Sequence, residues 1–187
     1  MKTIIAIVGM PGAGKSEVAD YLIKKDYSYI RLGQITLDKL SEMKLVINEK
    51  NERKIREEFR KKFGMAAFAI LNFPKINRLK GNIVIDGLYS WEEYLEFKKR
   101  FRNFYVLAVY SNPATRYGRL ISRSEKHKND IKNKYRSIAL EEAKARDVAE
   151  IEHLNKGGPI AMANFTIVNQ SNKKKLKEKV DEFLQQI

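Results

Sequence analysis

Residues 5–22, which read IAIVGMPGAGKSEVADYL, pass from an unbroken apolar run through three glycines and a proline into Lys15 and Ser16. The apolar run predicts a buried strand, and the residues after Ser16 predict a helix. Between them, residues 9–16 match the pattern G-x-x-x-x-G-K-[ST] in full. A strand before this pattern and a helix after it are the context in which it binds nucleotide phosphates. The segment therefore predicts a phosphate-binding loop in an α/β fold.

The residue types in this loop suit the binding of ATP and Mg²⁺. Gly12 and Gly14 allow the backbone to turn its N–H groups towards phosphate oxygens, and the helix N-terminus adds positive potential. We expect Lys15 to contact the β- and γ-phosphates and the Ser16 hydroxyl to ligate Mg²⁺. The expected nucleotide ligands are Gly9, Gly12, Ala13, Gly14, Lys15 and Ser16.

Short apolar segments recur along the chain between longer stretches with helical spacing. Near-continuous hydrophobicity is typical of strands that are covered on both faces, and alternation with helices favours a parallel sheet. We therefore expect an α/β fold of the P-loop NTPase class, with a five-stranded parallel sheet and helices on both faces. The expected strands are Thr3–Val8, Tyr27–Leu32, Asn82–Ile85, Asn103–Tyr110 and Asn164–Val168.

The length of 187 residues predicts one domain, residues 1–187, with a substantial core. Two segments do not belong to the minimal alternation of strands and helices. Residues 34–80 are charged and helical in composition, which predicts a helical insertion. Residues 124–134, SEKHKNDIKNK, are polar and basic, which predicts a small lid.

Composition limits the partners of the chain. It carries 37 Lys and Arg against 23 Asp and Glu, a net charge of +14, which favours nucleotides, nucleic acid or an anionic surface. The absence of cysteine excludes disulfides and cysteine nucleophiles and fits the cytoplasm. The apolar run at residues 4–10 is too short to span a bilayer, so we expect no membrane partner. No run of basic and aromatic residues forms a convincing platform for stacking bases, so nucleic acid lacks a motif.

Asp86 is the second candidate for chemistry at this site. In IVIDGLYS, residues 83–90, it ends a predicted strand and therefore lies at the same sheet edge as the phosphate loop. A carboxylate there can hold Mg²⁺ directly or through water, or orient the acceptor hydroxyl. An ordinary Asp–Gly turn is the alternative, but the phosphate loop favours the functional interpretation. Ser16 and Asp86 are thus the expected metal ligands.

Arginine side chains are the third candidate. In NPATRYGRLISRS, residues 112–124, helical spacing places Arg116, Arg119 and Arg123 on one face. Such a basic segment repels itself when empty and is expected to close when a polyphosphate arrives; a solvated basic helix is the alternative. Arg146 follows on a later predicted helix, where it could stabilise a developing transition state.

The order of these parts resembles the nucleoside monophosphate kinases and the dephospho-CoA kinases. It is most similar to the archaeal-type adenylate-kinase-related proteins. Besides the phosphate loop, the segments that carry the resemblance are DG-x-x-S at residues 86–90, R-D at residues 146–147 and GGPIA-x-A at residues 157–163. The resemblance covers nearly the whole chain.

The resemblance also implies roles for particular residues. Arg119 would stack on the adenine of ATP, and Arg123 and Arg146 would contact the transferring phosphoryl group. Residues 169–172, NQSN, would border the adenine pocket. The helical insertion at residues 34–80 would bind the acceptor.

The acceptor half departs from the family pattern. After the second strand, where the family has G-D-x-x-R, this chain has GQITL, with Gln34 at the acidic position and Leu37 at the arginine position. After the third strand, Tyr89 stands where D-G-x-R would place an arginine. The groups expected to grip the acceptor are therefore missing from one half of the site.

Three interpretations of this departure stay open. Asp38, one helical turn beyond Gln34, could replace the lost carboxylate. A phosphate clamp could instead come from the helix that carries Arg53, Arg56 and Arg60, although a solvated charged helix is the simpler interpretation. Finally, phosphoryl transfer could have been lost, which would leave slow ATP hydrolysis.

Together, these features predict a phosphotransferase that uses ATP and Mg²⁺ and acts on a small nucleotide or nucleotide-like acceptor. Its predicted catalytic residues are Lys15, Asp86, Arg123 and Arg146. The competing class is a nucleotide-dependent binding protein that has lost transfer and acts through a macromolecular partner.

Overall fold

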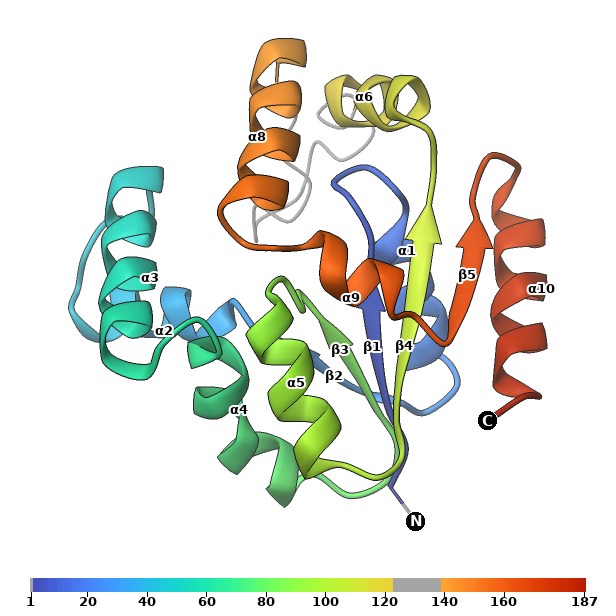
Figure 1. Ribbon diagram of the computed structural model, residues 1–187, viewed down its shortest axis with the longest axis horizontal. Helices are drawn as coiled ribbons and strands as arrows, with labels where there is room; N and C mark the ends of the chain where they lie inside the picture. Colours follow the sequence, from blue (N-terminus) through green and yellow to red (C-terminus); the bar gives the residue numbers. More distant parts are fainter. Residues whose placement is uncertain (1, 123–138) are drawn as a thin grey trace.

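A single parallel sheet of five strands forms the centre of the computed structural model, which describes residues 2–122 and 139–187 (Figure 1). The strands are β1 Ile4–Val8, β2 Ser28–Arg31, β3 Ile83–Asp86, β4 Phe104–Tyr110 and β5 Phe165–Val168. They lie in the order β2-β3-β1-β4-β5, and all four neighbouring pairs are parallel. The strand order therefore reverses at β1, and ligands of such sheets bind beyond the carboxyl ends of the strands at this point.

All five predicted strands are confirmed, each within one residue of its expected bounds. The physical reason is burial on both faces: no residue of β1 is more than 1% exposed. A strand without a solvent face needs continuous apolar sequence, which is the signal that residues 4–8 carry. The predicted α/β class, with helices on both faces of a parallel sheet, is also confirmed.

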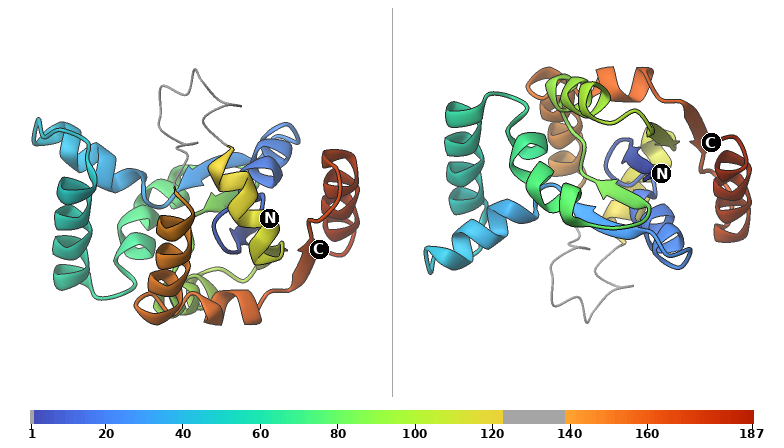
Figure 2. Two further views of the ribbon diagram at one scale, coloured as in Figure 1. Left: turned by 90° about the horizontal axis from the view of Figure 1, so that it is seen from above. Right: turned by 90° about the horizontal axis from the view of Figure 1, so that it is seen from below.

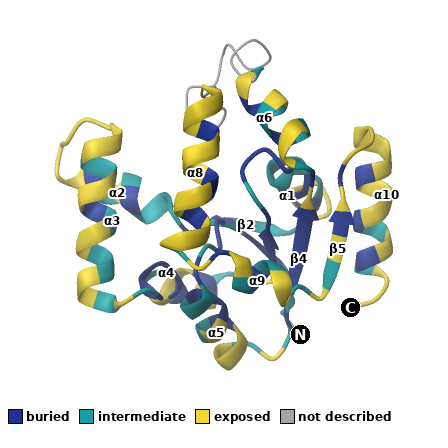
Figure 3. Ribbon diagram, turned by 45° about the horizontal axis from the view of Figure 1, so that its top comes forward, coloured by how far each residue is buried: buried dark blue, intermediate teal, exposed yellow. Residues whose placement is uncertain are grey.

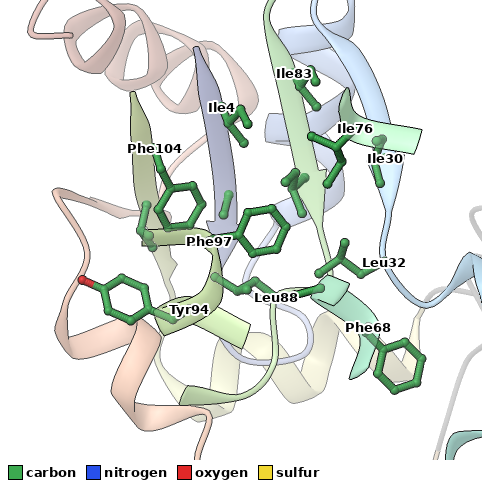
Figure 4. Packing of buried hydrophobic residues seen from close by; sticks show 14 of the residues in the cluster. Ile4, Ile30, Leu32, Phe68, Ile76, Ile83, Leu88, Tyr94, Phe97 and Phe104 are labelled. Atoms are coloured by element: carbon green, nitrogen blue, oxygen red, sulfur yellow. The ribbon is translucent and has the colours of Figure 1, made fainter. Parts of the chain in front are cut away.

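Successive residues of β1 belong to two different apolar layers, because the side chains of a strand point alternately to its two faces. The described helices are α1 Lys15–Ile23, α2 Gln34–Glu42, α3 Glu49–Phe63, α4 Ala67–Arg78, α5 Trp91–Arg100, α6 Pro113–Ile121, α8 Leu140–Glu152, α9 Gly157–Ala161 and α10 Lys173–Leu184. Ile4 and Ala6 pack with α4 and α5. The Phe97 ring centroid lies 5.2 Å from those of Phe73 and Phe104. Figure 4 shows Ile4, Phe97 and Phe104 in this layer. Ile5 and Ile7 pack on the opposite face with α1 and α10.

Residues 34–80, the segment predicted to be a helical insertion, contain α2, α3 and α4. Both views of Figure 2 show α3 at the side of the molecule, away from the sheet. Most of its surface is exposed in Figure 3, and Ile55 is its one fully buried residue. The charged composition of this stretch therefore reflects a helix that faces solvent around most of its circumference.

The carboxyl edge of the sheet lies beneath α6 and α8 (Figure 1). The predicted lid, residues 124–134, lies outside the described residues, as does Arg123. Within residues 2–122 and 139–187, no helix is both long and apolar enough to cross a membrane.

A capping box begins α5 and buries an acidic side chain. The Ser90 hydroxyl accepts from the Glu93 backbone N–H at 3.0 Å, and the Glu93 carboxylate accepts from the N–H groups of Tyr89 and Ser90 at 2.8 and 3.2 Å. Glu93 is 1% exposed. Burial raises the pKa of Glu93 from 4.5 to about 7, and the two N–H donors oppose that rise only in part.

This raised pKa predicts a pH-dependent stability. Between about pH 4.5 and about pH 7 the folded protein holds a proton that the unfolded chain has released, so stability falls as the pH rises through this window. Replacing Glu93 with glutamine keeps an acceptor for both N–H groups and removes the titration. The free energy of unfolding of the variant minus that of the wild type is expected to increase by about 2 kcal/mol from pH 5 to pH 8.

Urea unfolding at several pH values measures this gain. Glu96→Gln, on the same helix, is the matched control and is expected to keep the wild-type pH dependence. A wild-type profile that Glu93→Gln leaves unchanged would show that Glu93 does not titrate in this window.

Candidate functional site

The phosphate loop connects β1 to α1 at the carboxyl edge of the sheet (Figure 1). Gly12 and Gly14 adopt φ of +80° and +107°, the left-handed region that favours glycine. A Cβ atom at Gly12 would lie 2.6 Å from the Arg116 carbonyl oxygen, and one at Gly14 would meet the Asn169 side-chain amide. Both glycines are therefore required, by their backbone angles and by the segments packed against the loop.

Lys15 folds back into the loop that precedes it. Its amine donates to the carbonyl oxygens of Gly9 and Met10 at 2.8 and 3.2 Å. Desolvation inside the loop, together with the nearby Lys156 cation, lowers the pKa of Lys15 to about 7, and Asp86 and Glu150 oppose this shift. The loop thus holds an amine with few compensating anions, which is a suitable environment for a polyphosphate.

Asp86 ends β3 beside this amine. The Tyr29 hydroxyl on the neighbouring strand donates to the Asp86 carboxylate at 2.9 Å. Burial and the Asp86 charge hold the pKa of Tyr29 above its ordinary value, so this hydroxyl stays a donor. Asp86 is only partly buried. Tyr29 therefore orients a carboxylate that can still be reached from the carboxyl edge of the sheet.

Arg119 lies against the outer side of the phosphate loop. Its guanidinium donates to the Ser111 hydroxyl at 3.0 Å and to the Asn169 carbonyl oxygen at 2.9 Å. The Asn169 amide in turn donates to the Ala13 carbonyl oxygen at 2.8 Å. The structure thus brings together Arg119, the start of the NQSN segment and the loop.

Arg116, from the same predicted arginine face, has a different environment. It is 5% exposed, and its guanidinium forms a two-pronged ion pair with Asp147 at 3.0 and 2.6 Å. It also donates to the Pro11 carbonyl oxygen at 3.0 Å. Arg116 therefore joins α6, α8 and the phosphate loop, and it gives the aspartate of the R-D segment a structural role.

Arg146 lies on α8 and pairs with a carboxylate of the same helix. Its Nε donates to Glu150 at 3.1 Å, and the same carboxylate bonds the amine of Lys156. That amine lies 4.6 Å from the centre of the Tyr89 ring. Burial raises the pKa of Tyr89 to about 12, so its hydroxyl is neutral here.

Sequence reasoning missed Glu150, Lys156 and Tyr29 because no motif or spacing distinguishes them.

The acceptor-side candidates have partners within the helical insertion, residues 34–80. Gln34 donates its side-chain amide to Asp38 at 3.0 Å on the exposed side of α2. Arg53 pairs with Glu57 at 2.8 Å, so its charge is balanced within α3. Arg56 pairs with Glu49 at 2.6 Å and with Glu52 at 3.3 Å. Arg60 lies over the Phe68 ring at 5.4 Å. The exposed pair of Arg53 and Glu57 favours the interpretation of this part of α3 as a charged, solvated helix, whereas Arg60 is partly buried.

The residues present fit a nucleotide with Mg²⁺. The two left-handed glycines, the inward amine of Lys15 and the Ser16 side chain at the start of α1 supply positive and polar groups for phosphates. Within the described residues, no three His, Cys, Asp or Glu side chains gather to hold a metal ion. A site with one hydroxyl and one carboxylate suits Mg²⁺, which is commonly bound through few protein ligands and substrate phosphates.

Sequence comparisons place this site among related proteins. Residues 5–150 match a family model described as an AAA domain. The chain is 33% identical over 188 residues to a UPF0200 protein of Sulfurisphaera tokodaii, covering 98% of this chain and 97% of the relative. It is 29% identical over 189 residues to a UPF0200 protein of Thermococcus kodakarensis, with coverage of 98% and 97%.

Solved structures share the fold at low sequence identity. TT1252 from Thermus thermophilus has a TM-score of 0.66 and 17% identity, covering 100% of this chain and 98% of that chain. Shikimate kinase from Acinetobacter baumannii, solved in complex with shikimate, has a TM-score of 0.57 and 15% identity, covering 100% and 94%. The fold is thus that of the P-loop kinases, whereas the finer grouping with adenylate kinases and dephospho-CoA kinases stays a prediction. The chain belongs to the AAA domain family whose model it matches and to the UPF0200 family.

Proposed function

We propose that this protein is a phosphotransferase that uses ATP with Mg²⁺ and acts on a small nucleotide or nucleotide-like acceptor. The observation that carries the proposal is the environment of Lys15. Its amine bonds the loop carbonyl oxygens of Gly9 and Met10, and four charged groups act on its pKa: Asp86 and Glu150 raise it, whereas Arg146 and Lys156 lower it. Charged groups from the loop, β3 and α8 therefore surround the place where a γ-phosphate would lie.

Each side chain has a role that suits its position. The loop N–H groups and Lys15 would hold the donor phosphates, and Arg119 would border the adenine beside Asn169. Ser16 and Asp86 would hold Mg²⁺, which neutralises phosphate charge when it is bound. Asp86, oriented by Tyr29, could instead accept the proton of an acceptor hydroxyl. Arg146 would stabilise charge on the transferring group, together with Arg123 of the predicted lid.

The acceptor would lie between α2 and the segment after β3, where the family pattern is altered. Asp38 is the available carboxylate on α2, and it is already hydrogen-bonded to Gln34. The pair together could present an amide and a carboxylate to an acceptor. The helical insertion, residues 34–80, remains the proposed acceptor-binding region and residues 124–134 the proposed lid.

The test is ADP release from ATP with Mg²⁺, measured alone and with each nucleoside monophosphate and dephospho-CoA added in turn. The mass of each acceptor is followed in the same samples. Release that depends on an acceptor, with a matching phosphorylated product, is the expected result.

Tight ATP binding without a phosphorylated product from any of these acceptors would overturn the proposal. The alternative would then be a nucleotide-dependent regulator. A gel shift with nucleic acid that falls steeply with salt and is indifferent to ATP would support that alternative.

A further inference from the structure

Lys156 is an unusual side chain for its position. It is 1% exposed and is among the largest fully buried residues of the described chain. A buried ammonium ion is strongly destabilising unless it is paired. Its amine bonds the Glu150 carboxylate and lies over the Tyr89 ring, directly beside the proposed site. A lysine in the chain segment between α8 and α9 therefore places its charge inside the protein rather than in solvent.

Glu150 is shared between two cations. One carboxylate oxygen bonds the Lys156 amine, and the other accepts from Arg146 Nε at 3.1 Å. The Lys156 backbone N–H also donates to the Glu150 carbonyl oxygen at 3.3 Å. Burial alone would raise the pKa of Glu150, but Lys156 and Arg146 outweigh it and hold that pKa below its ordinary value. Glu150 therefore stays an anion.

Arg146 differs from its two partners in exposure. Its side chain is 51% exposed, whereas those of Glu150 and Lys156 are 8% and 1% exposed. An exposed ion pair one helical turn apart is ordinarily weak, because the long side chain loses rotamer freedom in forming it. Here the anion cannot move away, because Lys156 holds its other oxygen inside the protein. The buried pair thus gives Arg146 a fixed anchor.

We propose that Lys156 is a positioning residue that acts through Glu150 to hold the Arg146 guanidinium towards the γ-phosphoryl group of the bound nucleotide. This inference rests on the proposed function, since it assigns the donor phosphates to the same site. The three side chains carry two positive charges and one negative charge, so the cluster has a net positive charge beside Lys15. Preorganised charge of this kind needs no rearrangement when the reaction takes place.

The test compares the affinity for ADP with the affinity for a β,γ-imido analogue of ATP, each in the presence of Mg²⁺. The affinity for the analogue divided by the affinity for ADP isolates the contribution of the γ-phosphate. Arg146→Ala is expected to lower this ratio by about tenfold, as for loss of a charged hydrogen bond. Lys156→Met, which is close in size, is expected to lower it by a similar factor. The double variant Arg146→Ala with Lys156→Met is expected to have the same ratio as Arg146→Ala alone, because both changes remove the same contact.

Lys144→Met is the matched control, since Lys144 lies on the same helix and pairs with Glu141 at the surface. It is expected to leave the ratio unchanged. An unchanged ratio in Lys156→Met, or a further fall when Lys156→Met is added to Arg146→Ala, would overturn the inference. A purely structural role would lower the melting temperature and leave the ratio as in the wild type.

If Lys156→Met does not fold, Glu150→Gln combined with Lys156→Met removes both buried charges and tests the same anchor. The double change is expected to lower the ratio as Arg146→Ala does, and a wild-type ratio would contradict the inference. The binding ratio needs no acceptor. If the variants lower the ratio as expected but no acceptor is phosphorylated, the proposed function is overturned and the positioning role of Lys156 stands.

Discussion

Replacing Lys15 with alanine is expected to lower ATP-dependent turnover by about 10² to 10³-fold, the range found when one preorganised charge donor is removed. The amine is enclosed by the phosphate loop, where its own hydrogen bonds are to the Gly9 and Met10 carbonyl oxygens. A bound polyphosphate would supply the anionic partner that the loop lacks. The change removes a desolvated amine whose two hydrogen bonds are to loop carbonyl oxygens, so the fold is expected to remain intact.

Turnover and the melting temperature are measured together on this variant. Lys24→Ala is the control, because Lys24 lies at the exposed end of the same helix. It is expected to keep wild-type turnover. Unchanged turnover in Lys15→Ala would contradict the assignment of the donor site to this loop, whatever the acceptor is.

Replacing Asp147 with asparagine is expected to lower the free energy of unfolding by about 3 to 5 kcal/mol, as for a buried ion pair that loses one partner. Arg116 and Asp147 are 5% and 7% exposed, so solvent cannot replace the lost carboxylate. The Tyr117 hydroxyl also donates to Asp147 at 3.0 Å. The change therefore leaves a buried guanidinium without its anion and weakens the joint between α6, α8 and the phosphate loop.

Urea unfolding monitored by circular dichroism gives this free energy. Glu182→Gln is the matched control, because it breaks a half-exposed ion pair with Lys179 and is expected to change stability by less than about 1 kcal/mol. The double change Arg116→Met with Asp147→Leu is expected to recover most of the loss, since apolar partners of similar volume can replace a buried pair. If Asp147→Asn lowers the free energy of unfolding by less than about 1 kcal/mol, the ion pair between Arg116 and Asp147 does not stabilise the contact between α6, α8 and the phosphate loop.

The strands and the phosphate loop could be predicted because their signals are local. Burial on both faces requires the continuous apolar sequence of residues 4–8, and the loop requires glycine at the left-handed positions 12 and 14, just before Lys15. Each of these signals lies within a few residues of chain. A pattern in the sequence can therefore identify them without knowledge of the tertiary contacts that the same residues make.

The environment of each charged side chain could not be predicted in this way. Helical spacing placed Arg116 and Arg119 on one face of α6, but only packing against α8 buries Arg116 on Asp147, 31 residues away. Tyr29 meets Asp86 because β2 and β3 are neighbours in the sheet, at a separation of 57 residues. The spacing rules of helices and strands contain no information about such partners.

The sequence by itself determined the class of fold, the phosphate loop and the edge of the sheet at which the site lies. The tertiary structure decided which charges are buried, which are paired and which face the phosphates. Lys156 is one of 37 lysines and arginines in the sequence, and only its burial against Glu150 distinguishes it from the others. The physical reason is that the free energy of a charge depends on the solvent and partners around it, which only the folded chain supplies.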